Sequence, residues 1–125
     1  MAGFESKEAM QPVISKWLEL ISKDTQIAER CKGINVTMSF TMTDIDVLFY
    51  TNFNDGVVSA GLGKSDAMVF LEMSSATFDG MMIGEVDGAS AAMSGDLTFS
   101  GDMSAAMGLQ ALQEDMGRLY KEAKG

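Results

Sequence analysis

Residues 82–112 read M-I-G-E-V-D-G-A-S-A-A-M-S-G-D-L-T-F-S-G-D-M-S-A-A-M-G-L-Q-A-L, and this stretch decides the fold. Four of its glycines divide it, namely Gly84, Gly88, Gly95 and Gly101. Between the last two lies a short run in which Leu97 and Phe99 share one face, as alternate residues of a strand do. The stretch therefore predicts a helix, a strand and a second helix, separated by glycines. The upstream residues are expected to form the sheet that this unit closes.

After Gly101 the spacing of the apolar residues changes from that of a strand to that of a helix. Asp102 is a favourable N-cap residue, and a helix from here to about Lys121 carries two adjacent apolar rows. One row is Ala105, Leu109, Leu112, Met116 and Leu119, and the other is Met103, Ala106, Met107, Gln110 and Ala111. Two rows predict that this helix faces the sheet and a second surface as well.

The sheet itself is predicted from the alternation upstream. Residues 34–43 alternate apolar and polar side chains without an error, which is typical of a half-buried strand in an antiparallel sheet. Further strands are expected at 46–53, 57–62 and 66–73, with a hairpin turn at 54–56.

Two helices are predicted before the first strand. The first runs over residues 6–22, or it starts near Gln11 with Pro12 at its first position. The second is short and is capped by Asp24 or Ser22. Each of these alternatives agrees with the apolar spacing, so the sequence leaves the two boundaries open.

Two more helices are predicted after the fourth strand. Ser74 or Ser75 is expected to cap the first of them, and a shorter one follows at 89–94. The apolar side of the first consists of Phe78, Met81 and Met82, with Val86 as a further candidate. The complete order ααββββααβα describes an α+β domain with a mostly antiparallel sheet under helices. We expect the whole chain, residues 1–125, to form one domain.

Charge and composition exclude several classes of partner. The net charge is −9, and no basic cluster interleaved with aromatic residues is present, so we expect neither nucleic-acid binding nor strong electrostatic binding to anionic membranes. No run of about 18 apolar residues predicts a transmembrane helix. The start of the chain lacks the features of a signal peptide, and Cys31 is the single cysteine. A cytoplasmic location is therefore expected.

The chain contains no histidine, which removes the commonest general base and the commonest zinc ligand. The Asp-Gly pairs do not have the spacing of a calcium loop, and turn and cap chemistry explains them. We therefore expect no enzyme, no metal site and no cofactor. The 12 methionines are either core filler or the lining of an adaptable, ligand-accepting interior.

The C-terminal pattern resembles that of the sterol carrier protein 2 family. The matching residues are Gly84, Ala91, Gly95-Asp96-Leu97, Gly101-Asp102-Met103, Ala106-Met107 and Leu109-Gln110. The motif covers residues 66–112, and the expected element order agrees with the family over the whole chain. The resemblance implies a five-stranded sheet covered on one face by helices and enclosing an apolar tunnel.

The resemblance also implies a function and a set of site residues. The implied ligands are sterols, fatty acids, acyl-CoA or phospholipids, and the implied role is non-catalytic lipid binding or lipid transport. Carried over by position, Met103, Met107 and Gln110 line the tunnel mouth, with Gln110 contacting a head group. The opposite wall is implied to be formed by Phe78, Met81 and Met82.

The chain departs from the family pattern at several positions. Gly88 replaces a frequent proline, and Ala92 replaces a frequent aromatic residue, so a looser short helix and a larger cavity are expected. The last residues, 122–125, do not form a peroxisomal signal. An alternative to lipid transport is a structural or interaction module, or an accessory subunit, that has the same fold and a collapsed cavity.

Overall fold

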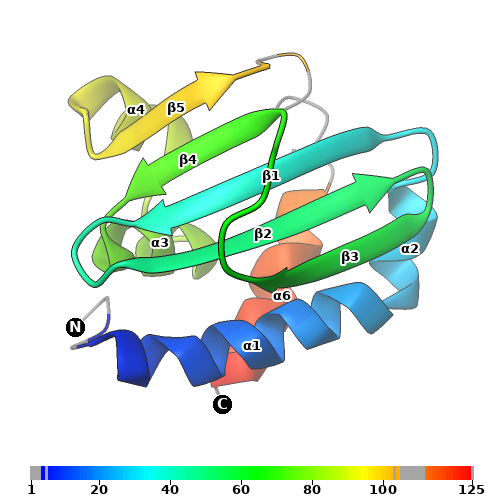
Figure 1. Cartoon of the computed structure of the whole chain (residues 1–125), viewed down its shortest axis with the longest axis horizontal. Helices are drawn as coiled ribbons and strands as arrows, with labels where there is room; N and C mark the ends of the chain where they lie inside the picture. The colour runs from blue at the N-terminus through cyan, green and yellow to red at the C-terminus, as the bar shows by residue number, and fades with distance from the viewer. Residues whose placement is uncertain (1–3, 5, 103, 105–111, 125) are drawn as a thin grey trace.

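The computed structural model describes residues 4, 6–102, 104 and 112–124. It has two layers, a five-stranded sheet and a set of helices that cover one face of it (Figure 1). The strand order across the sheet is β3-β2-β1-β4-β5. The strands are β1 (Asn35–Met42), β2 (Val47–Asn54), β3 (Val57–Leu62), β4 (Val69–Met73) and β5 (Leu97–Gly101).

The sheet is mixed but mostly antiparallel, as predicted. β1 with β2, β2 with β3, and β4 with β5 run antiparallel, whereas β1 and β4 run parallel at the centre. The parallel pair arises because the chain returns from the edge strand β3 across the sheet to β4 (Figure 1). The predicted α+β class and the five-stranded sheet are therefore confirmed.

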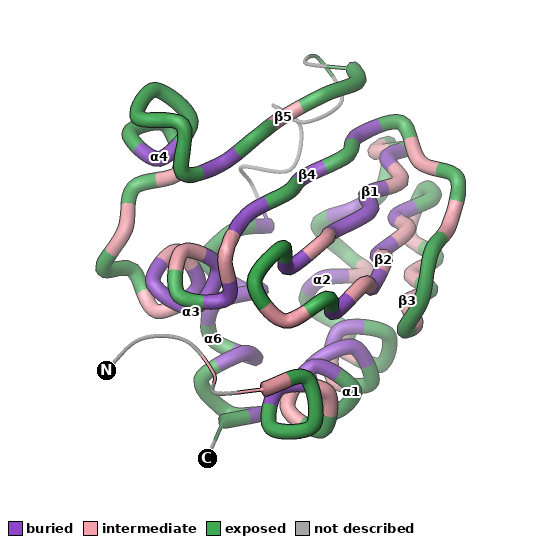
Figure 2. Tube along the Cα trace, turned by 60° about the vertical axis from the view of Figure 1, so that its left-hand side comes forward, coloured by how far each residue is buried: buried purple, intermediate pink, exposed green. Residues whose placement is uncertain are grey.

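The described helices lie on one side of the sheet, except that the short α4 lies beside β5 (Figure 1). They are α1 (Lys7–Lys23), α2 (Thr25–Arg30), α3 (Ser75–Met82), α4 (Gly88–Ser94) and α6 (Gln113–Lys124). Because the helices cover one face of the sheet, buried residues alternate with exposed ones along β4, as Figure 2 shows. In β4 the buried residues are Val69, Leu71 and Met73, whereas Phe70 and Glu72 on the other face are exposed.

The start of α1 differs from one of the two boundaries that the sequence allowed. Ser6 is the N-cap, and its side chain accepts a hydrogen bond from the N–H of Ala9 at 3.2 Å. Pro12 consequently lies inside the helix, and a start near Gln11 is wrong. The first turn is retained because Met10 is fully buried in the core, which offsets the hydrogen bond that Pro12 cannot donate.

The other helix starts follow the predicted cap residues. Asp24 accepts from the N–H of Ile27 at 2.9 Å, and Ser74 accepts from the N–H of Thr77 at 3.2 Å. Ser22 and Ser75, the alternative caps, have other partners: Ser22 donates its hydroxyl to the carbonyl of Glu19, and Ser75 donates to the carboxylate of Asp44. A side chain engaged in this way does not cap the next turn.

Several boundaries differ by a few residues. β4 begins at Val69 and not at residue 66, because its pairing with β1 starts at that position. α4 begins one residue earlier than predicted, directly after its cap Asp87. α6 continues to Lys124 and so extends beyond the predicted end near Lys121. The helix predicted to follow a cap at Asp102 falls largely on residues 103 and 105–111, which lie outside the described part of the chain, and the described helix α6 begins at Gln113.

Aromatic side chains fill the space between the sheet and three of the helices. They are Trp17, Phe40, Phe49, Phe78 and Tyr120. The ring centroid of Trp17 lies 5.5 Å from that of Phe78 and 5.7 Å from that of Tyr120, both in edge-to-face geometry. The Trp17 indole N–H also donates to the carbonyl of Met116 at 2.9 Å. This aromatic cluster therefore joins α1, α3, α6 and the sheet.

Candidate functional site

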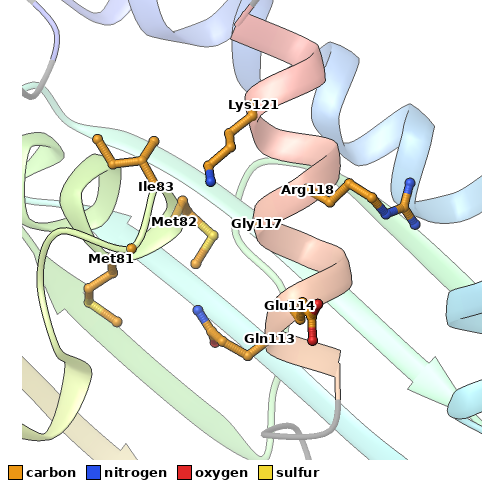
Figure 3. A pocket seen from close by; sticks show the side chains of 9 residues that line it. Met81, Met82, Ile83, Gln113, Glu114, Gly117, Arg118 and Lys121 are labelled. Atoms are coloured by element: carbon orange, nitrogen blue, oxygen red, sulfur yellow. The ribbon is translucent and has the colours of Figure 1, made fainter.

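A pocket of about 570 Å³ lies between the C-terminal end of α3 and the first three turns of α6 (Figure 3). The residues that line it are Met81, Met82, Ile83, Gly84, Gln113, Glu114, Gly117, Arg118 and Lys121. Two segments that are about 30 residues apart in the chain thus form its two walls. Methionine and isoleucine side chains form the wall on the α3 side.

A second pocket, of about 620 Å³, adjoins the first along the loop between α3 and α4. It is lined by Met81, Gly84, Glu85, Val86, Asp87, Gly88, Ala89 and Gln113. The two pockets share Met81, Gly84 and Gln113, so they form one two-lobed depression. We call it the α3–α6 cleft. Each lobe has the size of a site for a small organic molecule.

The close approach of α6 to α3 depends on Gly117. A Cβ atom at this position would lie 2.7 Å from the carbonyl oxygen of Met82, which is too close for any side chain. Gly80 has a similar role toward the loop, because a Cβ atom there would collide with the side chain of Val86. The amides of Glu85 and Val86 both donate to the Gly80 carbonyl, at 2.8 and 3.0 Å, and fold the loop back onto α3.

The two cations of the cleft point in different directions. Figure 3 shows the Lys121 side chain directed toward Met82 and Ile83, while Arg118 points away from them. Arg118 is ion-paired with Asp24 at 3.3 Å and with Asp115 at 3.5 Å. Lys121 forms no ion pair with any described residue. The Lys121 ammonium group is therefore available to an anion beside an apolar wall.

A buried carboxylate fastens α6 to α3. Asp79 is 1% exposed, and it accepts a hydrogen bond from the Tyr120 hydroxyl and an ion pair from the Lys124 ammonium, both at 2.7 Å. Burial, together with the hydrogen bond to Asp79, raises the pKa of the Tyr120 phenol well above its usual range. The phenol therefore remains a hydrogen-bond donor at neutral and moderately alkaline pH.

The structure places the six residues predicted for the site in three different settings. Met81 and Met82 lie together in the α3–α6 cleft. Phe78 is fully buried in the aromatic cluster and lines neither lobe of the cleft. Met103, Met107 and Gln110 lie outside the described residues.

Sequence reasoning did not single out Gly117 or Lys121. A glycine inside a helix costs about 1 kcal/mol relative to alanine, so Gly117 is a signal for close backbone approach. Lys121 carries no such signal, because a lysine in the last turns of a helix is also expected to interact with the helix dipole.

Two classes of site are not found in the described part of the chain. No group of three or more histidine, cysteine, aspartate or glutamate residues is placed to hold a metal ion there. Within the same residues, no helix combines the length and the apolar character needed to cross a membrane.

A model of the SCP-2 sterol transfer family matches residues 14–114. The chain belongs to this family. The resemblance predicted from the C-terminal motif is thus confirmed, and membership of the SCP-2 sterol transfer family supports lipid binding or transfer as the class of function. No curated protein matches the sequence.

Solved structures agree with the SCP-2 fold. The sterol carrier protein domain 2 of Helicoverpa armigera superposes with a TM-score of 0.65 at 16% identity, over 94% of this chain and 95% of that one. The Aedes aegypti sterol carrier protein 2 in complex with palmitate has a TM-score of 0.58 at 11% identity, over 81% of this chain and 94% of the mosquito protein.

An enzyme also contains a part with this fold. The sec-alkylsulfatase Pisa1 from Pseudomonas sp. matches 92% of this chain with a TM-score of 0.63 and 19% identity. The SCP-2 chain spans only 17% of the length of that enzyme. The match therefore concerns one part of the enzyme, and the likeness shows the fold alone.

Proposed function

We propose that this protein binds lipids without catalysing a reaction on them, and that it carries them between membranes. The α3–α6 cleft receives the apolar chain of the ligand against Met81, Met82 and Ile83. The ligand is a sterol, a fatty acid, an acyl-CoA or a phospholipid. Family membership and the palmitate complex of the Aedes aegypti protein support this assignment.

One observation carries the proposal. In the α3–α6 cleft an apolar wall with two methionines lies beside Lys121, a cation that no described carboxylate neutralises. This combination suits an amphipathic molecule with a long apolar chain and an anionic head. Burial of each methylene contributes about 0.8 kcal/mol, so about fifteen methylenes contribute about 12 kcal/mol, and about micromolar affinity remains after an association cost of about 4 kcal/mol is subtracted.

The cleft binds its ligand by burying the apolar chain and by adjusting its own side chains to the shape of that chain, and it needs no reactive group. Methionine side chains are unbranched and adjust to chains of different shape, and their displacement of water from the ligand supplies the driving force. Met103, Met107 and Gln110 belong to the same proposal as the lining of an apolar tunnel that continues from the cleft. A cytoplasmic location is also part of the proposal.

A matched pair of substitutions tests the site. Met81→Gln places an amide in the apolar wall, whereas Met93→Gln makes the same change at a methionine that is 90% exposed. Calorimetric titration of delipidated protein with palmitate should show affinity reduced about tenfold or more by the first change and unaltered by the second. Equal affinities of the two variants would show that the ligand binds elsewhere. Absence of binding to any long-chain lipid at micromolar concentration would contradict the proposed function.

A structural or interaction module with the same fold is the second candidate. The observation that favours it is the aromatic cluster, in which Trp17 and Phe78 are both fully buried and fill the interior between sheet and helices. Native mass spectrometry of the purified protein distinguishes the two. Copurified lipid supports a carrier, whereas an empty chain that forms a stable complex with a partner protein supports the module.

A further inference from the structure

The short helix α4 presents an apolar side chain to the solvent. Met93 is 90% exposed, more than any other large apolar side chain of the described residues. Ala91, two residues earlier, is 3% exposed and is the buried residue of this helix. Successive residues of an α-helix are rotated by about 100°, so Met93 lies on the side of α4 opposite to Ala91. The anchoring of α4 through Ala91 therefore directs Met93 outward.

Hydrogen bonds at both ends of α4 fix this orientation. The carboxylate of Asp87 accepts from the N–H of Ser90 at 3.1 Å and from its hydroxyl at 3.0 Å. At the other end, the hydroxyl of Ser94 donates to the carboxylate of Asp96 at 3.0 Å. The helix packs against β5, so it cannot turn Met93 inward without losing these bonds and that contact.

The exposed side of α4 is continuous with the α3–α6 cleft. Ala89 lines the second lobe of the cleft together with Met81 and Val86. Residues four positions apart in a helix lie one above the other, so Ala89 and Met93 share one side of α4, with Ala92 beside them. We call these three residues the α4 face. It extends the apolar lining of the cleft out to the solvent.

The size of the α4 face argues against a protein partner. A stable protein–protein interface buries about 800 Å² on each side, and one methionine with two alanines supplies far less. A lipid surface needs no matching contour, because an unbranched methionine side chain can enter between the head groups. Figure 2 shows α4 projecting from the rest of the fold beside β5, where it can reach a flat surface.

Charge selects the kind of lipid surface. None of the residues of α4 is charged, and acidic residues border it at Glu85, Asp87 and Asp96. The sequence contains no lysine or arginine between Lys64 and Arg118. An anionic bilayer is therefore repelled from this part of the chain, whereas a bilayer with zwitterionic head groups is not.

We propose that the α4 face is the membrane contact of this protein, with Met93 entering the interface of a zwitterionic bilayer and the second lobe of the α3–α6 cleft opening toward it. The inference rests on the proposed lipid transfer, because it gives the route by which a lipid passes between the bilayer and the cleft.

Tryptophan fluorescence tests the contact directly. Met93→Trp is mixed with a large excess of vesicles of phosphatidylcholine brominated on its acyl chains, and Val57→Trp, at a residue of β3 that is 68% exposed, is the control. The emission added by Met93→Trp should be quenched and should lie at shorter wavelength, whereas that of Val57→Trp should not change. The quenching should disappear when the vesicles are sedimented, because a brominated lipid held in the cleft would stay with the protein.

Three results of this experiment would overturn the proposal. They are equal emission of Met93→Trp with brominated and unbrominated vesicles, equal quenching in Val57→Trp, and quenching that persists after the vesicles are removed. Without vesicles, a shift of the Met93→Trp emission to shorter wavelength as the protein concentration rises would show that a second copy covers the α4 face, and would also overturn it.

Transfer kinetics provide a second measurement. Met93→Asp should reduce the rate at which a fluorescent fatty acid leaves phosphatidylcholine vesicles about fivefold or more, and Val57→Asp should not. The affinity for palmitate, measured by calorimetry without vesicles, should be the same in both variants and in the unchanged chain. An unaltered transfer rate in a Met93→Asp chain that binds palmitate would overturn the membrane contact and leave the proposed function standing. Failure of the unchanged chain to bind palmitate would instead contradict the proposed function, and with it the transfer route that this inference supplies.

Discussion

At the scale of single residues, Gly117 sets the width of the α3–α6 cleft. A methyl group there meets the backbone of Met82 and not a flexible side chain, so it can be accommodated only if the two helices separate. Such a movement widens the cleft. It also disturbs the contacts that Met116 and Tyr120, which lie on the same helix as Gly117, make with Trp17.

The first prediction concerns Gly117→Ala. Overpacking costs about 1–3 kcal/mol, and the better helix propensity of alanine returns about 1 kcal/mol, so the free energy of unfolding should fall by up to about 2 kcal/mol. Urea denaturation measures the change. Gly88→Ala is the control, because a Cβ atom at residue 88 meets only the terminal methyl group of Met81, at 3.3 Å. A stabilised Gly117→Ala variant would contradict the close approach.

The second prediction concerns Lys121. Lys121→Met keeps the length and apolar stem of the side chain but removes its charge, so the affinity for palmitate should fall about three- to tenfold while that for hexadecanol stays the same. Lys64→Met is the control, because Lys64 lies in the β3–β4 connection and lines neither lobe of the cleft. An equal loss for both ligands would show that Lys121 contributes packing and not charge.

At the scale of elements, α3 is held at both ends by polar contacts. At its start, the carboxylate of Asp44 accepts from the N–H of Ser75 at 2.8 Å and from its hydroxyl at 2.7 Å. Near its end, Asp79 holds Tyr120 and Lys124 of α6. The residues between these contacts are thereby fixed, and the methionines of the cleft follow directly after the second one.

The third prediction follows from the raised pKa of Tyr120. In the unfolded chain the phenol ionises near pH 10, whereas in the folded chain burial and Asp79 keep it protonated. Its contribution to stability is therefore complete below about pH 10 and is lost as the pH rises above that value. Chemical denaturation at about pH 8 and about pH 11 should show a smaller alkaline loss of stability in Tyr120→Phe than in the unchanged chain. An identical alkaline loss in the two proteins would contradict the shift.

Local signals in the sequence were enough to predict most elements. The alternation over residues 34–43 predicted β1. Two helix starts were each predicted to within two cap residues, and Asp24 and Ser74 are the ones that cap them. Each of these signals acts over a few neighbouring residues. The parallel pairing of β1 with β4 follows from the path of the chain across the sheet, and no short pattern contains it. The length of α1 was ambiguous because the burial of Met10, a tertiary effect, decides it.

The candidate site was predicted less completely than the fold. Phe78, Met81 and Met82 are all apolar residues on one short helix, and their spacing does not distinguish the side that faces the core from the side that faces a cleft. The structure separates them: Phe78 packs against Trp17, and the two methionines face α6. The approach of α6 is set by Gly117, about 35 residues further along the chain, so periodicity within α3 could not reveal it.

At the scale of the whole molecule, the net charge affects the proposed transfer of lipids between membranes. A charge of −9 repels anionic vesicles, and salt screens that repulsion over about 10 Å at 0.1 M. The rate of lipid transfer from vesicles that contain phosphatidylglycerol should rise about two- to fivefold between 10 mM and 200 mM salt. Transfer from phosphatidylcholine vesicles is the control and should not change. A rate that falls with salt on the anionic vesicles would indicate a basic docking surface.

The chain contains one tryptophan, and its indole lies at the junction of α1, α3 and α6 with its N–H bound to the Met116 carbonyl. The protein therefore has a built-in optical reporter of whether α6 is seated. Its emission should lie at short wavelength while the indole is buried and should move to the red when α6 separates from it on unfolding, so stopped-flow fluorescence can follow that step in real time without a label.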